Sequence, residues 1–311
     1  MLVALDVRTI GSEHIKQHKP LQDFSLSRTN RAKTAAFAIV ADGHGGEKYM
    51  RSADGSSLAV QCCKEAIEKT LRGGLIDCIK KRKTDDIEKT LLNLCSQILA
   101  SWHERISTHF SEHPLSAEEE QLCREQSLDF SSEASVFALY GTTLLAAMYL
   151  EPFNFWFALQ IGDGKCVAFH DDGTAFYPIA EDENLGFGIT TSLCSRNALE
   201  HFRYEYDFEP LSGIAVMTDG LADSFAIEKL PDFLRNIQKN AVADKEATKS
   251  ELALFLPKLS ERGSGDDISI AAIFAAPTQK NDMSVEMKQI TENIKAKFDS
   301  LAKKLGITEA H

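Results

Sequence analysis

The sequence predicts a layered α/β sandwich (α-β-β-α) in which two antiparallel β-sheets are flanked by antiparallel helices. First, short apolar runs bounded by Gly and Asp, which are typical of buried strands, recur along the chain. Second, the helical segments come in pairs between groups of strands, without the regular strand–helix alternation of a doubly wound parallel sheet. The 311 residues can also bury the substantial core that such a sandwich needs.

The N-terminal part is expected to contain one strand and one helical pair. Residues 1–30 look extended and rich in loops, and they end in a polar turn at Ser27–Asn30. A strand follows over Thr34–Ala41 and leads into a Gly-rich loop. Apolar residues at three- and four-residue spacing then predict two helices, Ser56–Leu71, ended by Gly73-Gly74, and the long helix Asp85–Phe110.

The remaining elements lie beyond residue 111. Residues 112–132 are polar and acidic, and we expect an exposed loop with a short helix there. Strands follow between Ser135 and Pro178, with a hairpin turn at Asp172-Gly173. Further elements are the strand Gly213–Thr218, helices over Pro231–Asn240 and Glu246–Glu261, and the last strand, Ile268–Phe274. One domain would therefore span residues 1–276, and residues 277–311 would form a C-terminal helical tail over Ser284–Leu305.

The composition is that of a globular protein with an acidic surface. Hydrophobic residues make up 43% and charged residues 26%, and the formal net charge is -12. This charge argues against binding to nucleic acid or to an anionic membrane. No apolar stretch is long enough to span a bilayer, and the N-terminus lacks a signal-peptide layout. The seven cysteines form no Cys-x-x-Cys, which favours reduced thiols in a cytoplasmic protein.

Acidic residues stand at the ends of the predicted strands. Asp42, Asp163 and Asp219 follow three strands, and Asp266 and Asp267 precede the last one. In an antiparallel sheet the end of one strand lies beside the start of its neighbour, so these carboxylates can gather on one edge. Clustered like charges repel each other unless cations hold them. The pattern therefore predicts a site for hard divalent metal ions.

The loop after the Thr34–Ala41 strand reads Asp42-Gly43-His44-Gly45-Gly46. Taken alone it fits an ordinary tight turn, because Asp-Gly is common at strand ends. Beside a metal site it has a further use, since Gly43 has no side chain and its carbonyl can approach a cation held by Asp42. His44 can donate or accept a proton near neutral pH.

Six segments resemble, in order, the motifs of the protein phosphatase 2C family of metal-dependent serine/threonine phosphatases. They are GSEHIKQHKPLQDF (11–24), ADGHGG (41–46), GTTLL (141–145), IGDGK (161–165), MTDGLAD (217–223) and GDDISI (265–270). Their order and spacing agree with the family pattern over about residues 10–275. One such match carries little weight, whereas six in the right order identify the chain as similar to this family.

The resemblance implies a metal ligand set. Asp42 would bridge two Mn²⁺ or Mg²⁺ ions. The Gly43 carbonyl, Asp219 and Asp266 would complete the protein ligands of the first ion. Asp23 would contact a metal directly or through water.

It also implies a third ion and a proton donor. Asp163 matches the position that, together with Asp219, holds a third and weaker ion. His44 matches the proposed general acid, which protonates the leaving alkoxide. With Asp42 it would form the catalytic pair.

The sequence departs from the family pattern at three positions. His18 replaces the phosphate-binding arginine, so phosphate would be bound less tightly or by another cation. Gln22 replaces the metal-linked glutamate and removes a charge, whereas Asp267 replaces the usual asparagine and adds one. Candidates for the phosphate-binding cation are His18 itself, Lys16, Lys48 and Arg51.

Together these features imply a phosphoric monoester hydrolase that removes phosphate from phosphoserine or phosphothreonine with a metal-activated water. Its partners would be phosphorylated proteins of a signalling system with a cognate serine/threonine kinase, with no nucleic acid and no membrane. Two alternatives stay open. A two-metal nuclease or phosphodiesterase is disfavoured by the net charge of -12. A phosphatase-like scaffold is disfavoured by the presence of Asp42, Asp219 and Asp266.

Overall fold

The computed structural model describes residues 1–126, 128, 132–180 and 190–276. The chain divides into two units, residues 1–276 and 277–311, and the described residues all belong to the first. The helix expected over Ser284–Leu305 lies outside them and stays a prediction. In the part that is described, no helix is long and apolar enough to cross a membrane.

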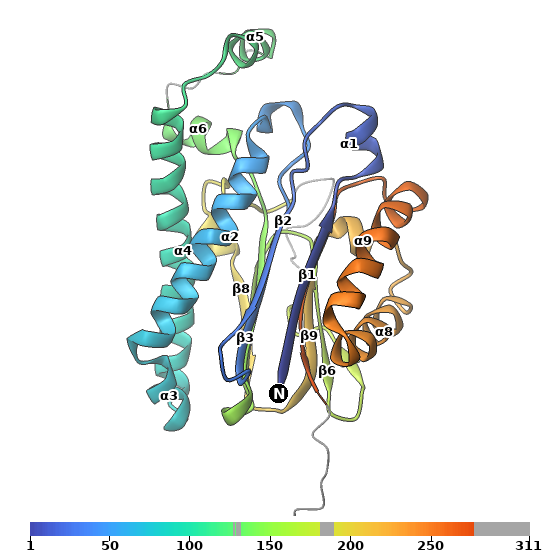
Figure 1. The fold of residues 1–311 in the computed structure, drawn as a ribbon. Helices are drawn as coiled ribbons and strands as arrows, with labels where there is room; N and C mark the ends of the chain where they lie inside the picture. Colours follow the sequence, from blue (N-terminus) through green and yellow to red (C-terminus); the bar gives the residue numbers. More distant parts are fainter. Residues whose placement is uncertain (127, 129–131, 181–189, 277–311) are drawn as a thin grey trace, which may run out of the picture. The chain divides into compact units, whose positions relative to one another are not determined.

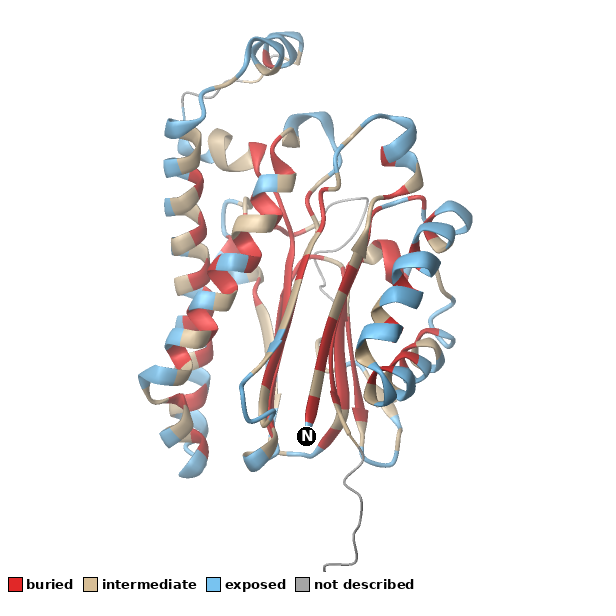
Figure 2. Ribbon diagram, in the orientation of Figure 1, coloured by how far each residue is buried: buried red, intermediate tan, exposed pale blue. Residues whose placement is uncertain are grey.

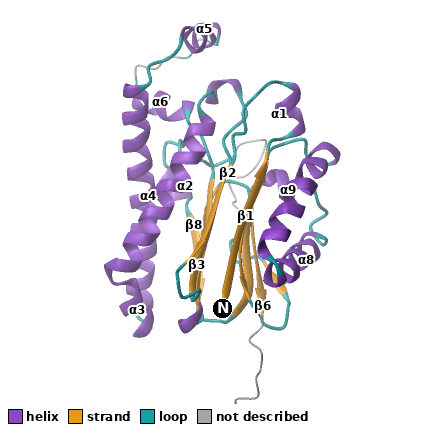
Figure 3. Ribbon diagram, in the orientation of Figure 1, coloured by secondary structure: helices purple, strands orange, loops and turns teal. Residues whose placement is uncertain are grey.

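Two antiparallel five-stranded sheets form the centre of the molecule and pack face to face (Figure 3). One sheet has the strand order β2 (Phe24–Thr29), β3 (Ala35–Ala41), β4 (Leu144–Leu150), β5 (Phe155–Ile161) and β8 (Arg203–Asp207). The other has the order β1 (Leu2–Thr9), β10 (Ile268–Ala275), β9 (Leu211–Met217), β6 (Lys165–His170) and β7 (Ala175–Phe176). The layer between the sheets is rich in alanine, which lets the two backbones approach closely.

Helices cover the outer face of each sheet (Figure 1). The long helices α2 (Ser52–Thr70) and α4 (Thr84–Glu112) lie on the β2–β8 sheet, and α8 (Leu230–Ala243) and α9 (Lys245–Arg262) lie on the other. Shorter helices are α1 (Ser12–Lys16), α3 (Ile76–Lys80), α5 (Ala117–Glu125), α6 (Glu133–Leu139) and α7 (Asp219–Ala222). The predicted layered sandwich is therefore confirmed.

Burial follows the predicted pattern on the long helix α4. The side chains at its three- and four-residue spacing are all buried against the sheet, as the red bands in Figure 2 indicate: Ile87, Leu91, Leu94, Ile98, Trp102 and Ile106. The indole Nε1 of Trp102 donates to the carbonyl of Gly55 at 3.0 Å, which joins α4 to α2. All seven cysteines are free, as expected.

Two local expectations were wrong. Ser27–Thr29 belong to β2, and the turn follows them, where the side chain of Asn30 accepts from the amides of Thr34 and Ala35. Residues 135–139 lie in helix α6 instead of a strand, because a short apolar run does not distinguish the two structures. The stop at Gly73-Gly74 is confirmed, since α2 ends at Thr70 and Gly74, with φ of 110°, breaks the helical path before the separate helix α3.

The strand register brings the acidic strand ends to one end of the sandwich. Phe24 pairs with Ala41, so the residue before β2 lies beside the residue after β3. In the other sheet Ile270 pairs with Met217, so the start of β10 lies beside the end of β9. Both sheets therefore present carboxylates at the end of the sandwich where α1 lies (Figure 1).

Candidate metal centre

Carboxylates from both sheets meet at this end. Asp23 is buried, and its Oδ2 accepts a hydrogen bond from Thr218 Oγ1 at 2.8 Å, so the start of β2 is joined to the end of β9. Asp42, after β3, and Asp219, after β9, lie close enough for each carboxyl group to shift the pKa of the other.

The pKa values of these groups are raised. Burial raises the pKa of Asp23 well above its ordinary range, and the charge of Asp267 raises it further. Burial also raises the pKa of Asp42, whose carboxyl is shielded from water although part of the residue is exposed, and the charge of Asp23 adds to it. For Asp219, burial raises the pKa to about 6. A bound divalent cation would relieve this repulsion and return the carboxyls to their ionised form.

The donor atoms fit a hard divalent cation. Asp219 Oδ1 is buried and has no hydrogen-bond partner among the described residues, so it is available to a ligand. A Cβ at Gly43 would lie 2.6 Å from the Gln22 carbonyl oxygen and 2.7 Å from that of Ser52, so only glycine lets the loop pass there. A Cβ at Gly220 would overlap the Asp267 carbonyl oxygen. The oxygen-rich set suits Mn²⁺ or Mg²⁺.

Asp163 lies in the turn between β5 and β6, which is braced by side chains. Thr190 Oγ1 donates to Asp163 Oδ2 at 2.5 Å. Gln160 Nε2 donates to the Gly162 and Gly164 carbonyls at 3.0 and 2.7 Å, and Arg203 donates to Gly162 at 2.6 Å. A cavity of about 300 Å³ lies beside the turn, lined among others by Gln160, Asp163, Lys165, Tyr177, Arg203 and Ile227.

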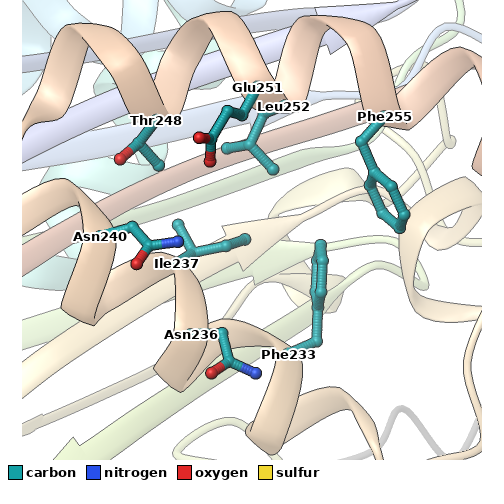
Figure 4. Close-up of a pocket in the computed structure, with 8 residues that line it drawn as sticks. All are labelled: Phe233, Asn236, Ile237, Asn240, Thr248, Glu251, Leu252 and Phe255. Atoms are coloured by element: carbon teal, nitrogen blue, oxygen red, sulfur yellow. The ribbon is translucent and has the colours of Figure 1, made fainter.

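A second cavity, of about 350 Å³, lies between α8 and α9 and has no acidic strand end in its lining (Figure 4). It is mostly apolar, and its lining residues are Phe233, Asn236, Ile237, Asn240, Thr248, Glu251, Leu252 and Phe255. Glu251 is the one ionisable side chain among these eight. This lining lacks the clustered carboxylates of the metal centre, and we assign it no chemistry.

His44 is held beside the carboxylates by its backbone. Its amide donates to the Gly141 carbonyl at 3.0 Å, and its own carbonyl accepts from Gln22 Nε2 at 3.3 Å. Its ring packs on Tyr49, with 4.6 Å between the ring centroids. Burial lowers the pKa of His44 to about 4, so its imidazole is neutral at pH 7 in the metal-free molecule. It would donate a proton to a leaving group only after taking one up.

The structure gives Arg51 a structural role in place of the expected phosphate contact. Its guanidinium donates to both oxygens of Glu119 at 2.7 and 2.8 Å, to the carbonyls of His113 and Pro114 at 2.6 and 3.1 Å, and to Tyr140 Oη at 3.0 Å. All five N–H groups are thereby used. The buried Arg51 thus fastens the connection between α4 and α5 to the start of α2.

The other cation candidates lie on the surface. Lys48 and His18 are exposed, and exposed Lys16 pairs with Glu13 at 2.6 Å. Lys48 lies near His44, because its positive charge also lowers the pKa of that histidine. A role in phosphate binding stays a prediction for Lys16, Lys48 and His18.

His14 is the residue at this site that sequence reasoning missed. The buried carboxylate of Asp267 accepts from the amides of Gly11 and Gln22, each at 2.6 Å, and His14 Nδ1 lies 2.9 Å from its Oδ1. The proximity of Asp267 raises the pKa of His14. The added carboxylate of Asp267 therefore has polar neighbours on several sides, and the available signal was the histidine of the GSEH segment.

Gln22 also braces the centre. Its Nε2 donates to Ser52 Oγ at 2.6 Å, and its carbonyl accepts from Ser56 Oγ at 2.5 Å. The residue before Asp23 is thus fixed to the start of α2.

Comparison with known proteins agrees with the fold. The family model "Protein phosphatase 2C" matches residues 10–257, and no curated protein matches the chain. Among solved structures, PppA of Pseudomonas aeruginosa, described as a key regulatory component of the T6SS, is 15% identical, with a TM-score of 0.53 over 88% of this chain and 97% of that one. The Mycobacterium tuberculosis serine/threonine phosphatase PstP/Ppp is also 15% identical, with a TM-score of 0.53 over 88% and 98%. The catalytic domain of PstP in complex with two manganese ions is 17% identical, with a TM-score of 0.50 over 88% and 99%. Because the family model spans most of the sequence and the fold agrees with it, the chain belongs to the protein phosphatase 2C family.

Proposed function

We propose that this protein is a metal-dependent protein serine/threonine phosphatase that hydrolyses phosphoserine or phosphothreonine in other proteins. The observation that carries the proposal is the meeting of Asp23, Asp42 and Asp219 from two sheets, with raised pKa values and a buried, unpaired oxygen. Membership of the protein phosphatase 2C family supplies the reaction class.

In this proposal the chain provides an oxygen cage for Mn²⁺ or Mg²⁺. Asp42 would bridge two ions, and Asp219, Asp266 and the Gly43 carbonyl would complete one set of ligands. Asp23 would contact a metal directly or through water, and Asp163 would hold a third ion with Asp219. When bound, such ions would supply the Lewis acidity that makes water a better nucleophile and that offsets charge on the phosphoryl oxygens.

Other residues would move the proton and position the substrate. His44 would protonate the departing serine or threonine alkoxide, which helps most when the leaving group is a poor one. The cavity beside Asp163 offers room for residues that flank the phosphorylated one. No covalent enzyme intermediate is needed, because water is the nucleophile.

The substrates would be phosphorylated by a cognate serine/threonine kinase, and the setting would be the cytoplasm. Seven free cysteines are consistent with a reducing compartment, and the net charge of -12 disfavours nucleic acid and anionic membranes as partners.

Phosphate release from a phosphothreonine peptide, measured with and without Mn²⁺, tests the proposal. The expected result is metal-dependent release with no nicking of DNA or RNA. Nicking without peptide hydrolysis would favour the nuclease or phosphodiesterase alternative. A protein that stays inactive in excess Mn²⁺ would favour the scaffold.

A further inference from the structure

His14 lies within reach of the metal centre from a separate element. It belongs to α1, between β1 and β2, and is only 7% exposed. Its imidazole is placed between two carboxylates, with Nδ1 2.9 Å from Asp267 Oδ1 and Nε2 3.7 Å from Asp266 Oδ1. One ligand atom from each of the three side chains lies within 4.8 Å of the others. The arrangement has the size of a cation site.

The two carboxylates differ in how many of their acceptor sites are still free to bind an ion. Asp267 is 2% exposed, and its oxygens already accept from two backbone amides and face His14 Nδ1. Asp266 is half-exposed, and its Oδ1 accepts from the Asp267 amide at 2.8 Å. A carboxylate has about four lone-pair sites, so most of those on Asp266 stay available. Asp267 is therefore suited to orient the imidazole, and Asp266 to bind an ion.

This is the arrangement that metal-binding histidines adopt. Such a histidine donates one ring N–H to a carboxylate, which fixes the tautomer and turns the other nitrogen's lone pair toward the metal. Here Nδ1 lies 2.9 Å from Asp267 Oδ1, close enough to donate after a small rotation of the ring, and Nε2 lies 3.7 Å from Asp266 Oδ1. The 3.7 Å between Nε2 and the Asp266 oxygen is less than twice the bond length of about 2.1 Å from such ions to nitrogen or oxygen.

We propose that His14 Nε2 and Asp266 together bind a divalent cation, with Asp267 as the residue that orients His14. The inference rests on the carboxylate metal centre of the proposed function and adds a nitrogen ligand to it. Imidazole suits transition metals, whereas Mg²⁺ prefers an all-oxygen octahedron. The centre would therefore favour Mn²⁺ over Mg²⁺ more strongly than carboxylates alone would.

Electron spin-echo envelope modulation of the Mn²⁺-loaded, full-length protein tests the ligand directly. The wild type should show coupling to a directly bound ¹⁴N nucleus, and labelling histidine with ¹⁵N should replace that coupling with one to ¹⁵N. His14→Gln should abolish it. The matched control is His170→Gln, because His170 ends β6 at the opposite end of the sandwich and should leave the coupling intact.

Metal binding to the same proteins gives a second readout. Loss of a partner that orients a metal ligand costs about 10–100-fold in affinity. We expect Asp267→Asn to weaken Mn²⁺ binding by about that factor, and His14→Gln by at least as much. Mg²⁺ affinity should fall less, so the ratio of the Mn²⁺ and Mg²⁺ dissociation constants should move toward one.

The outcomes separate this inference from the proposed function. No nitrogen coupling in the wild type, or a coupling that survives in folded His14→Gln, overturns the ligand role. A higher KM for phosphopeptide in His14→Gln, with coupling and Mn²⁺ affinity unchanged, also overturns it and makes His14 a phosphate contact. Loss of coupling in a protein whose wild type hydrolyses no phosphopeptide supports the ligand and refutes the phosphatase. If His14→Gln does not fold, the ¹⁵N-histidine label and Asp267→Asn decide the question.

Discussion

Replacing Asp219 with asparagine should stabilise the fold and abolish catalysis, because the charge of this carboxylate destabilises the folded protein but is needed to bind the metal. A pKa of about 6, against an ordinary value of 3.8, corresponds to about 3 kcal/mol at about 1.36 kcal/mol per unit. Because burial raises this pKa, the folded state is destabilised by this full amount above pH 6, where the carboxyl is ionised in both the folded and the unfolded chain. Below about pH 4 it is protonated in both, and the cost vanishes.

In EDTA, the wild type should therefore lose up to about 3 kcal/mol of stability as the pH rises from about 4 to 6. Asp219→Asn should lack most of this loss. At pH 7 its metal-free form should melt higher, by about 6–12 °C at about 2–4 °C per kcal/mol. Thermal unfolding followed by circular dichroism, at pH 4 and pH 7 in EDTA, measures both effects.

Asp219→Asn should also lose phosphatase activity, because the missing charge is that of a metal ligand. Phosphopeptide turnover at saturating Mn²⁺ should fall by more than about 100-fold, since a direct ligand matters at least as much as a partner that orients one. Near wild-type turnover would refute the role of Asp219 as a ligand. An equal pH dependence in the two metal-free proteins would refute the electrostatic reasoning.

Four further results are expected. Chelation with EDTA should abolish phosphopeptide hydrolysis and added Mn²⁺ should restore it, and activity that persists in excess EDTA would contradict a metal mechanism. His44→Ala should slow phosphothreonine peptides by about 10²–10⁴-fold but hardly affect p-nitrophenyl phosphate, whose leaving group needs little protonation; equal losses would exclude the general-acid role. Arg51→Ala should destabilise the fold by about 3–5 kcal/mol in denaturant titrations, because it leaves Glu119 without its partner, and should leave the KM for phosphopeptide unchanged. Gly43→Ala should weaken Mn²⁺ binding by displacing the loop from the Gln22 and Ser52 carbonyls, and calorimetry that finds unchanged affinity would count against the close packing there.

The layers of the fold and the carboxylates of the site were predictable because their signals are local. The apolar spacing along Asp85–Phe110 matches α4 within two residues, and the acidic residues follow or precede strands whose ends the sequence marks. Residues 135–139 were misassigned because the short apolar run Val136–Leu139 is compatible with either a helix or a strand.

Contacts distant in sequence could not be predicted in this way. His14 and Asp267 are separated by most of the chain and meet only because β1 pairs with β10. Arg51 lies close in sequence to the Asp42–Gly46 loop, which suggested a phosphate contact. The direction of its side chain is instead set by Glu119 and by the carbonyls at the end of α4, neither of which the local pattern reveals.

The hydroxyl of Thr218 joins the two sheets at a point where metal binding would join them again. It donates to Asp23 and accepts from the amide of Ser269, so it links β2 of one sheet to β9 and β10 of the other. A cation held by Asp42 and Asp219 would add a second link at the same end. An ion at about 100 times its dissociation constant stabilises a fold by about 2.7 kcal/mol. The concentration of free Mn²⁺ would then set how long the protein survives proteolysis as well as how fast it turns over its substrate.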